Sequence, residues 1–202
     1  MGLFDNLKNK VNQASGNKSE TIVFEKLPDN VEEFKALPQA ALATPFDTAA
    51  LTVLALCFYP ENKDASLEMI QFISGPREVT AYEKSFIKDR FADADYVPRS
   101  YFKGATPKND YAPSEPYSIV VSENPYSYDN EGYATMYITS GGADSPRSVK
   151  LRKGKDGKWY LWEQFLLVGI RKPESSNPWA YLNLVIIISE ELRLFGFFYP
   201  IR

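Results

Sequence analysis

Among the side chains that can take part in chemistry, tyrosines are the ones that cluster most clearly in the middle of this chain. The sequence holds 13 Tyr and 13 Phe, and the tyrosines concentrate between positions 96 and 137. Their rings can stack on a ligand and their hydroxyls can hydrogen-bond to it, so they could line a groove. We predict a ligand-binding site formed by Tyr96, Tyr101, Tyr111, Tyr133 and Tyr137. The alternative is that these rings fill the boundary between a sheet and solvent.

The absence of histidine restricts the chemistry that the chain could perform. The sequence has no His and a single cysteine, Cys57. The chain therefore lacks the residues needed for Ser-His-Asp hydrolysis, Cys-His catalysis, Cys/His zinc sites and His-ligated haem. Cys57 falls in an apolar run, and we interpret it as a packed, inert thiol. We expect no cofactor and no metal, and any catalysis would depend on carboxylates, Tyr, Lys or Arg.

Two acidic pairs lie in segments that we expect to be loops. Asp93 and Asp95 form one pair, and Asp129 and Glu131 form the other. Such carboxylates could exchange protons with a substrate or hold Mg²⁺ or Ca²⁺. Neither pair continues into the pattern of a calcium-binding loop, which favours solvated loops. An enzyme or degenerate enzyme-like pocket domain that uses Tyr and Asp or Glu remains an alternative.

A basic stretch beside three aromatic residues resembles a surface that binds nucleic acid. The aromatic residues are Trp159, Tyr160 and Trp162. The polar positions of a half-exposed hairpin face water in any case, and lysines at its edge prevent edge-to-edge pairing, so we do not expect nucleic acid as a partner. The basic residues are Arg147, Lys150, Arg152, Lys153, Lys155 and Lys158.

Residues 140–145, SGGADS, favour a turn over a phosphate loop, because no Lys-Ser/Thr pair follows.

Helix start signals dominate the first half of the chain. Asn30 and Thr80 each precede a glutamate three residues further on, which makes a capping box, and Thr44 precedes a proline suited to a first helical turn. With a further start at residue 62 or 64, these signals predict helices near residues 31–37, 44–59, 62–74 and 80–91. The second of these is apolar nearly all round, which predicts that it is buried in the core.

Strand patterns dominate the second half. Residues alternate with period two over 117–122, 133–139, 148–153 and 158–167, and a short run at 21–24 is a further strand or a lead-in. Residues 92–116 between the two halves show no period, so they form a binding loop, a packed excursion or a misread segment. The fold class is therefore α+β, with N-terminal helices packed on a curved antiparallel sheet of about four strands, connected as a meander.

The chain divides into one domain and two terminal segments. We assign residues 1–20 to a flexible or amphipathic N-terminal segment, 21–180 to a single α+β domain, and 181–202 to an apolar C-terminal extension. The apolar residues of the first segment have helical spacing. The segment could therefore form an amphipathic helix that lies on a membrane or a partner, or a helix that frays. The apolar run of the extension is too short to span a bilayer. A net charge of −3 and a lone cysteine make the cytoplasm the expected location.

Several stretches carry a resemblance to a known family. They read LPDNVEEFKALPQAAL, DYVPRSYFKGATP, SGGADSPRSVKLRK and WYLWEQFLL. They resemble an uncharacterised, mostly Gram-positive bacterial family of domains of unknown function, over residues 27–180. The resemblance implies a bacterial origin and a shared fold, and it brings no activity and no site residues.

These observations favour a non-catalytic binding or protein-interaction module of the bacterial cytoplasm. Its partner would be a protein or a small molecule, and its oligomeric state is open. The alternatives are the enzyme-like domain and a peripheral membrane protein attached through the N-terminal segment. An enzyme needs two acids that converge at the floor of a pocket on the concave face of the sheet, whereas a module exposes an apolar or Tyr-rich patch.

Overall fold

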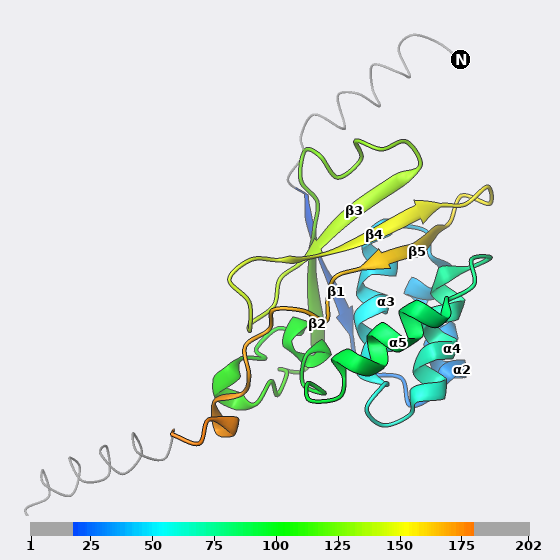
Figure 1. The fold of residues 1–202 in the computed structure, drawn as a ribbon. Coiled ribbons are helices and arrows are strands. Elements are labelled where there is room, and N and C mark those ends of the chain that lie inside the picture. The colour runs from blue at the N-terminus through cyan, green and yellow to red at the C-terminus, as the bar shows by residue number, and fades with distance from the viewer. Residues whose placement is uncertain (1–17, 180–202) are drawn as a thin grey trace, which may run out of the picture.

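The described part of the molecule is residues 18–179, in a computed structural model of the chain (Figure 1). Nearly all of the predicted N-terminal segment and the whole C-terminal extension lie outside these residues. Membrane attachment through the N-terminal segment therefore stays a prediction. Among the helices between residues 18 and 179, none combines the length and the apolar character needed to cross a bilayer.

A five-stranded antiparallel sheet forms one layer of the domain. Its strands lie in chain order, and β2 to β5 form the predicted meander. β1 adds a fifth strand by pairing with β2, for example Ile22 opposite Ile119. The α+β class is confirmed, with one strand more than the predicted four. The strands are β1 (Ser19–Phe24), β2 (Tyr117–Ser122), β3 (Tyr133–Ile138), β4 (Arg147–Lys153) and β5 (Trp159–Gln164).

Side-chain caps start four helices where the sequence predicts them. Asn30, Thr44, Asn62 and Thr80 each accept a hydrogen bond from a backbone N–H group of the first turn. Before the fourth helix, Glu83 accepts from the backbone N–H of Thr80 and completes the capping box. The helices are α2 (Val31–Ala36), α3 (Pro45–Cys57), α4 (Lys63–Ser74) and α5 (Ala81–Arg90).

Helix α3 occupies the centre of the core. It contacts all five strands, so it lies across the inner face of the sheet (Figure 1). Nearly all of its residues are buried, in one cluster with inward-facing strand residues such as Met136, Val149 and Leu151. Burial of this apolar surface, at about 25 cal/mol per Å², provides the main stabilisation of the fold. Helix α3 therefore fills the centre of the inner face of the sheet, where the enzyme-like alternative would need its pocket.

Strand β5 forms one edge of the sheet, and two helices lie beside that edge. Helix α4 contacts both β5 and α3. Helix α5 follows after a turn that begins at Gly75 and runs in front of α4 in Figure 1. The space between β5 and α5 is therefore bounded by an edge strand on one side and by a helix on the other.

The long segment between α5 and β2 is a packed excursion, which was one of the three predicted alternatives. It contains the 3-10 turns η2 (Pro98–Tyr101) and η3 (Pro107–Asn109), and Phe102 bridges to Ile119 on β2. The backbone N–H of Gly141, after β3, donates to the carbonyl of Ser100 at 2.9 Å. A Cβ atom at Gly141 would overlap the carbonyl oxygen of Ala105, so only glycine permits this approach. The SGG turn thus packs against the excursion.

Candidate functional site

Three of the five predicted site tyrosines are buried within the packed excursion. Tyr96, Tyr101 and Tyr111 are all at least nine-tenths buried. The hydroxyls of Tyr101 and Tyr111 donate at 2.6 Å to the backbone carbonyls of Leu166 and Arg171, and the rings of Tyr96 and Tyr111 stack 5.4 Å apart. Burial raises the pKa of the Tyr101 hydroxyl far above its ordinary value. These side chains tie the excursion to the segment after β5.

The other two predicted tyrosines lie on the outer face of β3. Tyr133 and Tyr137 are half-buried there, and alternate residues of the strand face the core. The ring of Tyr133 makes an edge contact with Trp162, with 5.7 Å between the centroids. The guanidinium of Arg152 lies 5.5 Å from the Tyr133 ring. The five tyrosines therefore do not form one cluster, and only Tyr133 reaches the aromatic and basic residues of the sheet edge.

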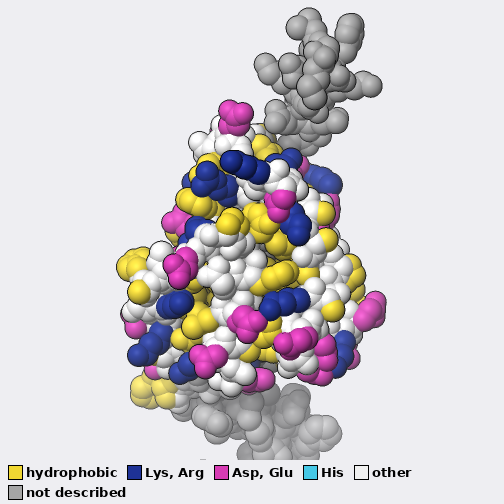
Figure 2. All heavy atoms as spheres, turned by 90° about the vertical axis from the view of Figure 1, so that its right-hand side faces the viewer, with side chains coloured by type: hydrophobic (Ala, Val, Ile, Leu, Met, Phe, Trp, Pro, Cys, Tyr) yellow, Lys and Arg dark blue, Asp and Glu magenta, His cyan; other side chains and the backbone are white. Residues whose placement is uncertain are grey.

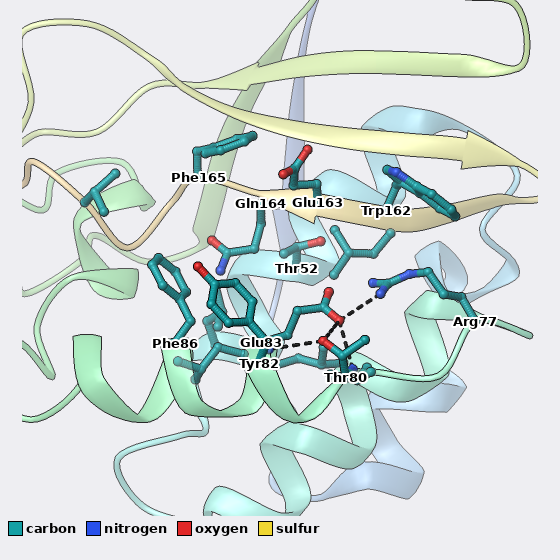
Figure 3. Close-up of a pocket in the computed structure, with 16 residues that line it drawn as sticks. Thr52, Arg77, Thr80, Tyr82, Glu83, Phe86, Trp162, Glu163, Gln164 and Phe165 are labelled. Atoms are coloured by element: carbon teal, nitrogen blue, oxygen red, sulfur yellow. Dashed lines mark hydrogen bonds and ion pairs between the residues drawn. The ribbon is translucent and has the colours of Figure 1, made fainter.

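A cavity with largely apolar walls lies between helix α5 and strand β5, and we call it the α5–β5 cavity (Figure 3). Its volume is about 540 Å³. In Figure 3, Tyr82 and Phe86 point into it from α5, and Gln164 points into it from β5. Its apolar lining residues are Leu56, Ile70, Val79, Phe86, Ile87, Leu161, Trp162, Phe165 and Val168.

One ion pair organises the polar end of the α5–β5 cavity. Nη1 of Arg77 donates to Oε2 of Glu83 at 2.8 Å, and the hydroxyl and the backbone N–H of Thr80 donate to the same oxygen. Burial disfavours the ionised form of Glu83, but these hydrogen bonds outweigh it and lower the pKa of the carboxyl. Glu83 is therefore held as a carboxylate that orients Arg77.

Gln164 presents a hydrogen-bond donor to the same space. Its Oε1 accepts from the backbone N–H of Leu166 at 2.9 Å, which turns its amide nitrogen toward the cavity (Figure 3). Within residues 18–179, no group accepts a hydrogen bond from that nitrogen. The cavity thus combines apolar walls with a donor that is free for a ligand.

The acids of the α5–β5 cavity do not converge. Glu83 turns toward Arg77, whereas Glu163 points to the other side of β5 (Figure 3). In the part of the chain that the structure describes, no three His, Cys, Asp or Glu side chains come together as a metal site. Burial also raises the pKa of the Cys57 thiol to about 12, which keeps it protonated near neutral pH.

A second cavity, of about 450 Å³, lies beside the hairpin that joins β4 and β5, and we call it the hairpin cavity. It shares Arg77, Leu161 and Trp162 with the α5–β5 cavity, so the two adjoin. Its charged lining residues are mostly basic. They are Arg77, Arg152, Lys153, Lys155 and Asp156.

Sequence reasoning did not predict the α5–β5 cavity. It singled out several residues of the hairpin cavity, among them Arg152 and Trp162, but interpreted them as a half-exposed hairpin. It identified the capping box at Thr80 and Glu83 but not the contact of that box with Arg77. The edge position of β5 and its approach to α5 depend on long-range packing, which local patterns do not contain.

Comparison with known proteins identifies a family and no function. Residues 26–174 match the model of a family described as Domain of unknown function (DUF6935). None of the curated proteins matches the chain. None of the solved structures matches it either.

Proposed function

The chain belongs to the DUF6935 family, to which no function is assigned, and from its geometry we propose that it is a non-catalytic binding module. Its ligand is a small molecule with an apolar body, which occupies the α5–β5 cavity. One observation carries the proposal: apolar walls surround a cavity of about 540 Å³ whose donor on Gln164 has no acceptor among residues 18–179. Ligand pockets have typical volumes of about 300–1,000 Å³ and few, well-placed polar groups.

The charged groups of the cavity support binding over catalysis. A general acid near neutral pH needs a raised pKa, whereas hydrogen bonds lower the pKa of Glu83. Glu163 turns to the other side of β5 and leaves Glu83 without a second acid beside it in the cavity (Figure 3). The chain has no histidine that could replace either acid. We place the module in the cytoplasm of a bacterium, which agrees with the lone, protonated thiol of Cys57.

Fluorescence titration with N-phenyl-1-naphthylamine, an uncharged apolar probe, tests the proposed function. Phe86→Asp places a carboxylate in the apolar wall, and we expect it to weaken binding to the full-length chain about tenfold or more. Phe86 is only partly buried on α5, so the fold should tolerate the change, which far-UV circular dichroism checks.

Tyr126→Asp provides the matched control, because Tyr126 is an exposed aromatic residue outside the cavity lining. The control should bind the probe as the unchanged chain does. Equal weakening by both substitutions, or the absence of saturable binding to the unchanged chain, would show that the α5–β5 cavity is not the site.

A further inference from the structure

We propose that the hairpin cavity is an anion site, which binds a phosphate monoester group at one end of the ligand. The inference rests on the proposed function, because the apolar body of the same ligand would occupy the α5–β5 cavity. Arg77, Leu161 and Trp162 line both cavities, so one molecule can extend from one into the other. The ligand is then an amphipathic phosphate.

The positive charge of the hairpin cavity is not neutralised by its own surroundings. Four basic side chains and one acid line it. No carboxylate within residues 18–179 forms an ion pair with Arg152, Lys153 or Lys155. The acid, Asp156, is already engaged, since it accepts hydrogen bonds from the Tyr160 hydroxyl at 2.6 Å and from a backbone N–H. The chain as a whole carries −3, so this positive charge is a local feature.

Arg77 has donors to spare in a fixed position. Glu83 holds its Nη1, and its guanidinium lies 5.6 Å from the centroid of the Trp162 ring. Its Nε is buried with no partner, and its Nη2 also lacks an acceptor among the described residues. A buried donor without a partner is destabilising, and a small shift toward an oxyanion would remove that cost. Arginine presents its donors as a fork that fits phosphate oxygens.

Two guanidinium groups lie close to the ring of Trp162. That of Arg77 lies 5.6 Å from the ring centroid, and that of Arg152 lies 4.8 Å from it and also contacts Tyr133. A guanidinium that lies over an aromatic ring is held by cation–π attraction while its N–H groups stay free. Both arginines therefore keep N–H groups free for an anion beside the same indole.

A β-bulge explains the position of Trp162. Lys150 pairs with Glu163 and Leu151 pairs with Leu161, so Trp162 is the extra residue on β5. Such bulges change the direction of a side chain at a sheet edge and are frequent beside binding sites. On the face of the molecule shown in Figure 2, basic side chains lie in the upper part, and further basic and acidic side chains are interspersed with hydrophobic ones below them.

Calorimetric titration of the full-length chain with octyl phosphate, octanol, octanoate and inorganic phosphate tests the site. We expect octyl phosphate to bind about tenfold or more tightly than octanol, and to lose this advantage as salt is added. Arg152→Gln should reduce the ratio of the two affinities severalfold and leave octanol binding unchanged. Lys63→Gln removes the same charge from an exposed position on α4 and should leave the ratio unchanged.

The outcomes separate this inference from the proposed function. If octanol and octyl phosphate bind equally, the anion site is refuted while the apolar cavity stands. If octyl phosphate and inorganic phosphate bind equally and octanol does not bind, the anion site stands and the proposed function fails. If octanoate binds as tightly as octyl phosphate, the assignment to a phosphate monoester is wrong.

Discussion

Glu83 links the helix cap to the polar end of the α5–β5 cavity. One of its oxygens accepts hydrogen bonds from Arg77 and from two donors of Thr80. Because these bonds lower its pKa below the ordinary value, the ionised form contributes stability that is complete above the ordinary pKa. That contribution is lost as the pH falls through the pKa of the folded state. The acid limb of the stability profile therefore depends on this residue.

Glu83→Gln should lower the free energy of unfolding at pH 7 by about 1 kcal/mol, because it removes a charge-assisted hydrogen bond and half of the capping box. The loss should shrink as the pH falls through the lowered pKa of Glu83, where the unchanged chain also loses the carboxylate. Urea unfolding between pH 3 and pH 7 measures both. Glu131→Gln, in an exposed loop, serves as the control. A loss of the same size at every pH would contradict the role given to the ion pair.

The tyrosines that the sequence singled out lie in different places, for a physical reason. Tyr101 and Tyr111 use their hydroxyls to satisfy backbone carbonyls in the interior, and Tyr96 stacks on Tyr111. A sequence does not distinguish a ring that anchors a loop from a ring that faces a ligand. Trp162 acquires its position from a bulge, which no local pattern in the sequence marked.

At the scale of elements, the helices could be predicted because their signals are local. Thr44 and Thr80 cap helices through bonds that span only three residues. The pairing of β1 with β2 and the position of β5 at the edge depend on contacts between distant parts of the chain. The α5–β5 cavity is a product of such contacts, so its existence could not be predicted from the sequence.

The contact between the SGG turn and the excursion provides an element-scale prediction. Gly141→Ala places a methyl group on the carbonyl oxygen of Ala105 and should cost about 3 kcal/mol of stability. Gly157→Ala is the comparison, because its Cβ meets no atom and only a left-handed backbone opposes it, at about 1 kcal/mol. Urea unfolding ranks the two variants. If Gly141→Ala proves the milder change, the excursion does not pack as described.

At the scale of the whole molecule, the centre of the core lies on the inner face of the sheet, and the two cavities lie at its β5 edge. Helix α3 fills the inner face of the sheet and forms the core. The excursion is fixed to the far end of β5 by buried tyrosines. The cavities remain at the β5 edge, between elements that the core already holds in place. The proposed ligand would therefore bind with little rearrangement of the fold, which would lower the entropic cost of binding.

Mapping of backbone amide chemical shifts by NMR during titration with octyl phosphate is the sharpest test of a ligand site in the α5–β5 cavity. The largest shifts should fall on residues 79–87 of the α5 side and 161–168 of the β5 side, with residues 152–156 of the hairpin also affected. Residues 96–111 of the excursion should change little, because their tyrosines are buried. Shifts concentrated in the excursion, or spread evenly over the chain, would contradict a binding module that uses the α5–β5 cavity.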